Sequence, residues 1–286
     1  MDKFGFDNPY TPSQAHAPTP QLHNELLGDC MNILARETVA EMLPLHSGST
    51  IIDVACGTGA GTAALVAQIK DATNLSIKGV EWNEEMLATY AQKAKDNSWP
   101  AEAIHQDVQK LSIADDTFSH AIGTAVLSAL PRDAVPALRE VYRTLKPGGV
   151  AVFNSWAHVP NMEPIRTASR LTRPQGSPLP RDKMKKWEDH NFLRRIFKQS
   201  GFEDNRIAIL KREIVVTTTG VDRYAGLLWS FLGGSSTAGW LAADGEKWEE
   251  AVAIVKEELV KSDGYRELEG GKMQLKFVAN VIVARK

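Results

Sequence analysis

Acidic side chains lie in three short apolar runs in the first half of this 286-residue chain. Asp53 lies within residues 51–55, Glu81 near the end of residues 75–82, and Asp107 near the end of residues 101–108. Such runs predict β-strands, and parallel strands of an open α/β sheet bring their carboxyl ends to the crevice where ligands bind. Three carboxylates around one crevice repel a pyrophosphate and suit a cationic ligand.

A glycine-rich turn follows the first of these runs. In IIDVACGTGAGT, residues 51–62, a predicted strand leads into Gly57, Gly59 and Gly61 and then into a helix. Glycine lets the backbone turn sharply and approach a ligand closely. A dinucleotide site has the spacing G-x-G-x-x-G, whereas this segment has G-x-G-x-G with Thr62 at the third expected position. Because the acidic motifs contain no Lys or Arg, they favour a ligand that carries an ammonium and a sulfonium, which is S-adenosylmethionine.

The segments around these motifs alternate between predicted strands and helices. Such alternation indicates a parallel sheet with helices on both faces. We therefore predict an α/β fold, a doubly wound and mostly parallel sheet of Rossmann-like type, with inserted helices capping its C-terminal edge. Strands are expected at 51–55, 75–82, 101–108, 118–125, 150–156, 206–218 and 273–284.

The chain is expected to be one domain preceded by an arm. Residues 1–20 contain four prolines and predict an extended or disordered segment. Residues 21–286 are expected to form a single domain, with a cofactor-binding core at 49–156 and substrate-covering insertions at about 157–200 and 221–262. The spacing of apolar residues predicts one helix over 21–43 and another around 192–197.

Composition indicates an ordinary globular protein. Hydrophobic residues make up 43% and charged residues 24%, and the net charge of -2 disfavours a dedicated nucleic-acid binder. The two cysteines, Cys30 and Cys56, exclude a disulfide framework. No apolar run approaches the roughly 18 residues that a membrane-spanning helix needs, and the N-terminus has no signal-peptide apolar region. These features predict a cytoplasmic protein.

Four motifs in order resemble those of class I S-adenosylmethionine-dependent methyltransferases. They are IIDVACGTG, GVEWNEEML, HQDV and ALREVYRTLKPGG, and the resemblance covers about residues 49–156. It implies that Gly57 and Gly59 line the methionine and ribose portion of the cofactor. It also implies that Glu81 accepts hydrogen bonds from both ribose hydroxyls and that Asp107 receives the adenine amine. The family often has an aspartate where this chain has Ser119, at the strand end remote from the ligand.

The same resemblance extends the expected cofactor site. It implies that Trp82 and Met86 pack on the adenine, that Val108 lies beside it, and that Thr124 faces the methionine end. The remaining expected cofactor-binding residues are Asp53, Ala55, Thr58 and Asn83. Asp53 has the alternative of a strand-end turn residue, and Glu81 has the alternative of a cap for the following helix.

The C-terminal half carries the expected acceptor site. GGVAVFNSWAHVPNMEPIRTA, followed by Pro-Leu-Pro, is similar to fungal small-molecule methyltransferases of secondary metabolism, among them thiol methyltransferases acting on sulfur-containing diketopiperazines. His158, just past the predicted fifth strand, is a candidate general base or a simple loop histidine. The expected substrate-binding residues are Trp156, Met162, Trp229 and Phe231, with the core of the inserted helices as their alternative role.

Three classes of function follow. The first is methyl transfer to a small molecule by in-line displacement, with S-methylation favoured over O- or N-methylation and with proximity and desolvation supplying the catalysis. The second is a nucleic-acid methyltransferase, suggested by residues 166–198, whose ten basic and three acidic residues give a net charge of +7. The third is a non-catalytic ligand-binding protein of the same fold. The sequence favours the first class, without metal, nucleic-acid or membrane partner. It leaves the oligomeric state open and favours a monomer slightly. The resemblance implies that residues 10–30 close over the cofactor.

Overall fold

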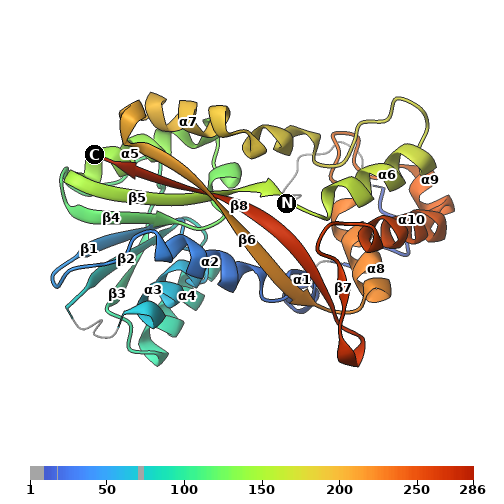
Figure 1. Ribbon diagram of the computed structural model, residues 1–286, viewed down its shortest axis with the longest axis horizontal. Helices are drawn as coiled ribbons and strands as arrows, with labels where there is room; N and C mark the ends of the chain where they lie inside the picture. Colours follow the sequence, from blue (N-terminus) through green and yellow to red (C-terminus); the bar gives the residue numbers. More distant parts are fainter. Residues whose placement is uncertain (1–9, 18, 70–73) are drawn as a thin grey trace. The chain divides into compact units, whose positions relative to one another are not determined.

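One sheet runs through the computed structural model, which describes residues 10–17, 19–69 and 74–286. Within these residues the strand order is β3-β2-β1-β4-β5-β8-β6, and β7 pairs with β8 (Figure 1). The strands are β1 (Thr50–Val54), β2 (Ser76–Glu81), β3 (Ala101–His105), β4 (Phe118–Gly123), β5 (Leu145–His158), β6 (Ile207–Thr218), β7 (Arg266–Glu267) and β8 (Met273–Arg285).

The strands β1 to β5 are parallel to one another. Val54 pairs with Val80 between β1 and β2, and Glu81 pairs with His105 between β2 and β3. Strand β4 lies parallel to both β1 and β5, so the carboxyl ends of β1 to β5 lie at one edge. Strand β8 runs opposite to β5, because Lys286 at its end exchanges backbone hydrogen bonds with Gly148 and Gly149 near the start of β5.

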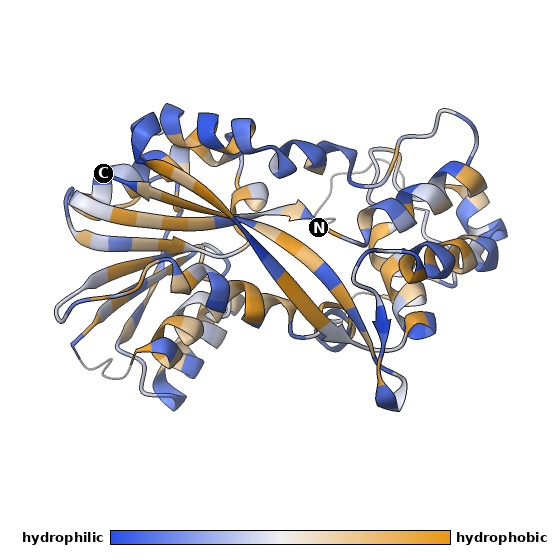
Figure 2. Cartoon of the chain, in the orientation of Figure 1, coloured by the Kyte–Doolittle hydropathy of each residue, from blue (hydrophilic) through white to orange (hydrophobic). Residues whose placement is uncertain are grey.

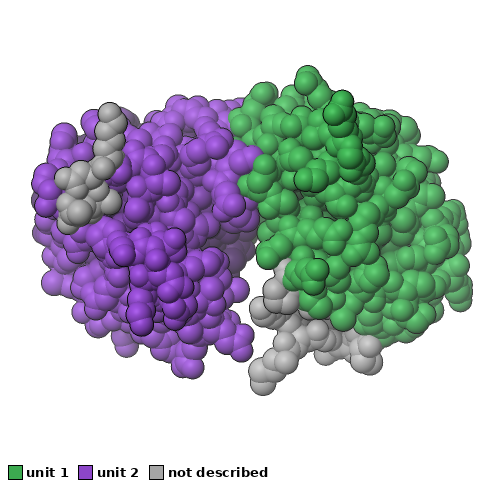
Figure 3. Space-filling view, turned by 90° about the horizontal axis from the view of Figure 1, so that it is seen from below, with its two compact units in different colours: residues 1–30, 158–186, 213–278 green, residues 31–157, 187–212, 279–286 purple. Residues whose placement is uncertain are grey.

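The chain divides into two compact units, drawn in different colours in Figure 3. Unit 2 contains residues 31–157, 187–212 and 279–286, and unit 1 contains residues 1–30, 158–186 and 213–278. The helices of unit 2 are α2 (Cys30–Ala40, its first residue in unit 1), α3 (Ala60–Gln68), α4 (Glu84–Asp96), α5 (Val135–Thr144) and α7 (His190–Gln199), with 3₁₀ turns at Leu127–Ala129, Arg132–Ala134 and Asp204–Arg206.

Alternating side chains of the strands form two cores in unit 2. Val150 and Val152 of β5 pack in a cluster with Leu65 of α3 and Val39 of α2. Phe153 points to the opposite face, where its ring meets Phe197 of α7 at 5.9 Å. Figure 2 shows the hydrophobic strands, and Figure 1 shows α5 and α7 on one side of them and α2 and α3 on the other. The expected doubly wound, mostly parallel sheet is confirmed.

Unit 1 is mainly helical. Its helices are α1 (Pro20–Leu27), α6 (Met162–Thr172), α8 (Val221–Leu232), α9 (Ala242–Glu246) and α10 (Trp248–Val260), with 3₁₀ turns at Asp182–Glu188 and Glu269–Gly271. Helix α6 packs against α8 and α10. A buried ion pair joins Arg173, directly after α6, to Asp244 of α9 at 2.7 Å. Arg173 also donates hydrogen bonds to the carbonyl oxygens of Gly233 and Gly239, so it fixes the segment between α8 and α9.

The structure changes several expected boundaries. The helix expected over 21–43 is two helices, because Gly28 adopts a φ of 55° between them and a Cβ there would lie 2.3 Å from the carbonyl oxygen of Thr217. Residues 157–200, expected as one insertion, are divided between the units, and α7 lies with the sheet. Half of the expected arm, residues 1–9 and 18, lies outside the described residues. The two late β-rich runs join the sheet as expected.

Candidate cofactor site

The glycine-rich turn after β1 leaves space in front of its backbone. Ala55 and Gly57 have φ angles of 51° and 54°, and a Cβ added to Gly57 would meet nothing within 4 Å. Gly59, the N-cap of α3, has a φ of 91° and is held from behind, because a Cβ there would lie 2.9 Å from Trp99 and 3.0 Å from Tyr90. The turn is therefore packed on one side and open on the side of Gly57.

Asp53 lies beneath this turn. Its side chain is 2% exposed, and its Oδ2 accepts hydrogen bonds from the Thr62 backbone amide at 3.0 Å and from the Thr62 hydroxyl at 2.7 Å. Burial raises the pKa of this carboxyl to about 6, and the two bonds from Thr62 oppose that rise. Gly61 makes the fit possible, since a Cβ there would lie 3.0 Å from Oδ2. Through these hydrogen bonds Asp53 holds the first turn of α3.

A buried hydroxyl pair continues from Asp53 to α4. The Thr62 hydroxyl lies 2.9 Å from the Tyr90 hydroxyl. Because Thr62 gives its hydroxyl proton to Asp53, Tyr90 is the donor in the second bond when Asp53 is ionised. The Tyr90 ring lies over Gly79 of β2, where a Cβ would be 2.3 Å from it. These contacts fix α3 and α4 against strands β1 and β2.

Glu81 connects the two neighbouring strand ends. Its Oε2 accepts a hydrogen bond from the Gly57 amide at 3.0 Å, and its Oε1 accepts bonds from the amides of Trp82 and Asn83, each at 2.9 Å. A carboxylate has about four acceptor positions, so one position on Oε2 is left for a ligand. A second ribose hydroxyl would have to share Oε2 with the Gly57 amide.

Two apolar side chains stand exposed beside Glu81. Trp82 is 70% exposed and Met86 is 41% exposed. The intervening Asn83 caps α4, because its side-chain oxygen accepts a hydrogen bond from the Met86 amide at 2.9 Å. Exposed aromatic surface next to a hydrogen-bonding carboxylate is suited to a ligand with a flat apolar part and hydroxyl groups.

Asp107, two residues past β3, is held by its own turn. Its Oδ1 accepts hydrogen bonds from the Gln109 amide at 2.9 Å and from the Gln109 side chain at 3.2 Å. Arg132 in turn donates a hydrogen bond to the Gln109 side-chain oxygen at 2.9 Å. Val108 is buried beside this turn. Sequence reasoning did not single out Gln109 or Arg132, since neither belongs to a motif.

Thr124 follows β4 at the same edge. Its hydroxyl oxygen is buried and has no hydrogen-bond partner among the described residues. The next residue, Ala125, has a φ of 54° and donates its amide proton to the Asn154 side chain at 2.8 Å. Asn154 donates in turn to the Thr38 hydroxyl at 2.7 Å, so a buried network holds the loop that carries Thr124.

One basic residue reaches this edge from outside the motifs. Lys93 of α4 donates a hydrogen bond from its Nζ to the carbonyl oxygen of Thr58 at 3.1 Å. The three acidic residues lie near the carboxyl ends of three neighbouring strands, Asp53 within β1, Glu81 at the end of β2 and Asp107 after β3. An open glycine turn, a free acceptor on Glu81, an exposed indole and an unpartnered Thr124 hydroxyl fit S-adenosylmethionine.

Comparison with known proteins identifies this region. A family model described as a methyltransferase domain matches residues 51–149. The demethylmenaquinone methyltransferase of Bacillus licheniformis is 32% identical over 117 residues, which are 41% of this chain and 49% of that protein. Residues 51–149 are a class I methyltransferase domain. The resemblance of the motifs and the expectation of S-adenosylmethionine as cofactor are thus confirmed for this domain. The chain spans about half the length of the curated relatives it matches.

Solved structures share the fold of this chain over most of its length. The YcgJ protein of Bacillus subtilis has a TM-score of 0.55 at 15% identity, covering 88% of this chain and 97% of that one. Phosphoethanolamine N-methyltransferase 2 of Haemonchus contortus, in complex with phosphomonomethylethanolamine and S-adenosylhomocysteine, has a TM-score of 0.53 at 15% identity, covering 93% and 56%. At these identities the likeness concerns the fold.

The expected substrate residues and His158 are divided between the two units and differ in how far they are buried. Trp156, partly buried near the end of β5, lies in unit 2, whereas His158 is exposed and lies in unit 1. Met162 begins α6 and Phe231 lies near the end of α8, both partly buried within unit 1. Trp229 is completely buried in unit 1, with its ring 5.8 Å from that of Trp240. It therefore occupies the helical core, the alternative that the sequence left open.

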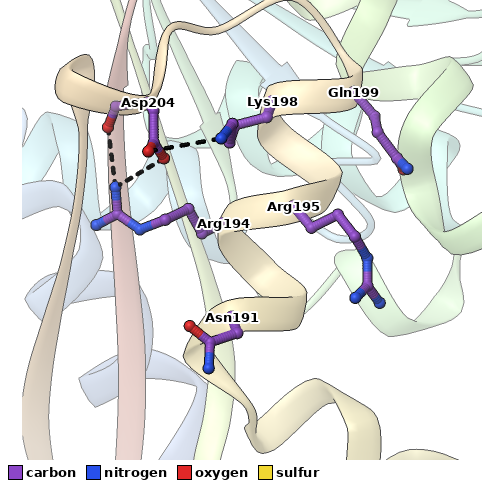
Figure 4. A pocket seen from close by; sticks show the side chains of 6 residues that line it. All are labelled: Asn191, Arg194, Arg195, Lys198, Gln199 and Asp204. Carbon is purple, nitrogen blue, oxygen red and sulfur yellow. Dashed lines mark hydrogen bonds and ion pairs between the residues drawn. The ribbon is translucent and has the colours of Figure 1, made fainter.

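The basic stretch 166–198 is divided between the two units. Residues 166–186 belong to unit 1 and residues 187–198 to unit 2. On α7, Arg194 and Lys198 both pair with Asp204, at 3.2 and 3.5 Å, around a surface hollow of about 400 Å³ that Figure 4 shows from close by. Arg195 extends away from Asp204 and lies over the Phe192 ring at 5.3 Å. With Arg170 paired to Glu163 and Arg173 to Asp244, four of the ten basic residues of this stretch pair with acidic side chains.

The described residues hold neither a cluster of metal-ligating side chains nor a membrane-spanning helix. Across residues 10–17, 19–69 and 74–286, no group of three or more His, Cys, Asp and Glu side chains converges to hold a metal ion. Among the helices of the same ranges, none is long and apolar enough to cross a membrane.

Proposed function

We propose that this chain transfers the methyl group of S-adenosylmethionine to a small-molecule acceptor. The observation that carries the proposal is the arrangement around Glu81, whose carboxylate holds the Gly57 turn and the Trp82 backbone while one acceptor position stays free. When bound, S-adenosylmethionine supplies an electrophilic methyl group on a sulfonium. The acids at the strand ends suit that positive charge, and the exposed Trp82 and Met86 suit the adenine.

Each strand end has a separate task in this proposal. Glu81 binds the ribose hydroxyls, Asp107 accepts a hydrogen bond from the adenine amine, and Thr124 presents its unpartnered hydroxyl to the methionine portion. Asp53 acts from beneath, because its hydrogen bonds to Thr62 hold the first turn of α3 and with it the open turn at Gly57. The protein contributes mainly alignment and exclusion of water, which lower the barrier of an in-line displacement by about 7–11 kcal/mol.

A small molecule is a better acceptor than nucleic acid for this surface. Binding to phosphates needs several free Lys or Arg side chains on one face. In this chain Arg173 is buried against Asp244, and Arg194 and Lys198 share Asp204. The pairing disfavours a phosphate-binding face, so the small-molecule class is retained and the nucleic-acid class becomes an outcome of the test.

Among small molecules we favour a sulfur acceptor of secondary metabolism. A thiol, with an ordinary pKa near 8.5, is partly ionised at neutral pH and needs little help from a protein base. A phenol, with an ordinary pKa near 10, gains about 10²–10⁴-fold from one. The demethylmenaquinone methyltransferases that this domain resembles carry in their name a further acceptor for the test, demethylmenaquinone.

The proposal is tested by incubating the full chain with S-adenosylmethionine labelled in its methyl group. Small thiols, phenols, demethylmenaquinone and RNA serve as separate acceptors, and label is measured in each product. We expect transfer to a thiol, and the Glu81→Ala variant, assayed at a cofactor concentration below its weakened affinity, is the control with reduced transfer. Calorimetry with S-adenosylhomocysteine distinguishes the non-catalytic alternative, which binds the ligand but transfers no label. Labelled RNA or an absence of cofactor binding contradicts the proposal.

A further inference from the structure

Trp82 is an unusual residue for an exposed position. Its side chain is 70% exposed although it is large and mostly apolar. It lies directly after β2 and directly before Asn83, the N-cap of α4. Packing on an adenine, the role expected for Trp82, would cover this exposed apolar surface. What keeps this indole in place is therefore part of how the site works.

The backbone of Trp82 is held from both sides. Its amide donates a hydrogen bond to Oε1 of Glu81 at 2.9 Å. Its carbonyl oxygen lies 2.8 Å from Nε2 of His105, the residue that pairs with Glu81 across β2 and β3. A carbonyl oxygen only accepts hydrogen bonds, so Nε2 of His105 carries a proton and donates it. His105 thus fixes the peptide that follows Trp82.

The same histidine lies beside the indole. The rings of His105 and Trp82 are 5.9 Å apart with an angle of 37° between their planes. The other ring nitrogen, Nδ1, lies 4.0 Å from a carboxylate oxygen of Glu84 in the first turn of α4. His105 therefore contacts the backbone and the ring of Trp82 while it remains exposed to solvent.

These contacts contribute little to folding. Water can satisfy an exposed carbonyl oxygen, and an exposed histidine buries little apolar area. A contact that orders an exposed indole does matter for a ligand, because a wall that is already ordered loses less entropy on binding. The effect of His105 is expected on binding and not on stability.

We infer that His105 is a positioning residue that holds Trp82 as one wall of the adenine subsite. The inference rests on the proposed function, since it assigns His105 to the site that takes the adenosine portion of the cofactor. His105 acts through Trp82 and touches no reacting atom. His105 opens the HQDV motif, but from the sequence it was expected only to be a structural residue of its strand.

The experiment is calorimetry of the full chain with S-adenosylhomocysteine and with 5′-methylthioadenosine, which carries the adenosine but no amino acid. Trp82→Ala is expected to weaken both ligands about tenfold or more, the loss typical of one base stacked on an aromatic ring. His105→Ala is expected to weaken both about three- to tenfold with no change in melting temperature. His105→Gln, whose amide donates a hydrogen bond from a similar distance, is expected to restore wild-type affinity.

Two comparisons complete the test. In the Trp82→Ala background, His105→Ala is expected to cause no additional loss, since its effect passes through the indole. Glu102→Gln, an exposed change on the same strand that affects only an ion pair with Lys78, is the matched control and is expected to leave affinity unchanged.

Unchanged affinity in His105→Ala, no rescue by His105→Gln, or losses that multiply in the double variant would overturn this inference while cofactor binding by the wild type stands. A wild-type chain that binds neither ligand overturns the proposed function and this inference with it.

Discussion

The carboxylate of Asp53 receives both hydrogen-bond donors of Thr62, the backbone amide at 3.0 Å and the hydroxyl at 2.7 Å. Thr62 lies in the first turn of α3, so an acid inside β1 holds the helix that follows the glycine turn. The sequence suggested Asp53 as a cofactor-binding residue. Its burial shows a structural task at the base of the site, and its direct contact with a ligand stays a prediction.

Burial of Asp53 makes folding depend on pH. Its folded pKa is raised to about 6 from an ordinary value of 3.8, so the folded state holds this proton more tightly than the unfolded state. The stabilisation from this group is therefore full below pH 4 and is lost as pH rises to about 6. We expect Asp53→Asn to gain on the order of 3 kcal/mol relative to wild type between pH 4 and pH 7.

Urea unfolding of both proteins at several pH values measures this difference. Glu85→Gln, at an exposed position in α4, is a control that leaves the pH dependence as in wild type. Parallel stability curves for wild type and Asp53→Asn would show that Asp53 has an ordinary pKa in the folded protein.

Glu81 is expected to be the most sensitive residue for cofactor affinity. Glu81→Ala removes a charged acceptor for ribose and frees the Gly57 amide, so S-adenosylhomocysteine should bind more weakly by about 2–3 kcal/mol. Calorimetry measures the loss, and Glu85→Gln again is the matched control on the following helix. Equal affinity in Glu81→Ala, or micromolar affinity of the wild type for NAD, contradicts the assignment of the ligand.

The buried pair of Arg173 and Asp244 is expected to control the stability of unit 1. Both side chains are fully buried, and removing one partner leaves an uncompensated charge. Arg173→Met should therefore destabilise the protein by about 3–5 kcal/mol, whereas Arg173→Met combined with Asp244→Asn should recover a large part of the loss. Arg170→Met, which removes an exposed pair with Glu163, should change stability by under about 1 kcal/mol. Denaturant unfolding measures all three, and equal losses in the single and double variants would contradict the role of the pair.

The docking of the N-terminal arm against α9 is expected to require a glycine at position 245. The Gln14 side chain donates a hydrogen bond to the Gly245 carbonyl oxygen at 3.0 Å, and a Cβ on Gly245 would meet the Tyr10 hydroxyl. In a helix Gly→Ala normally stabilises by about 1 kcal/mol. We expect Gly245→Ala to stabilise the chain only when residues 1–17 are deleted, and to release the arm to protease in the full chain. A similar gain in both backgrounds would show that the arm does not dock there.

The acceptor atom is tested by His158. For a thiol acceptor, His158→Ala should lower turnover by less than about tenfold and leave the shape of the pH–rate profile unchanged. For a phenol or alcohol, loss of a general base should cost about 10²–10⁴-fold and remove the rise of rate with pH. A strong loss of turnover with cofactor affinity retained would contradict S-methylation.

Local patterns were enough to predict the sheet and to place the glycine turn and the acids at its strand ends, whereas their contacts with a cofactor stay predictions. Apolar runs predict strands, glycines at 57 and 59 predict the open turn, and acids at strand ends converge because parallel strands place their carboxyl ends at one edge. These inferences need only neighbours along the chain and one rule of topology. They can therefore be made from the sequence without knowing how the side chains pack.

Contacts between distant parts of the chain decided the rest. Arg173 and Asp244 are 71 residues apart, and only packing shows that they bury one another. The charge of residues 166–198 counts as one run in the sequence, but the structure divides it between two units and pairs Arg194 and Lys198 with Asp204. Trp229 and Trp82 are the same type of residue, yet Trp229 is wholly buried and Trp82 is largely exposed. Burial depends on which side chains the tertiary fold brings together, and local patterns along the sequence do not show which distant residues those are.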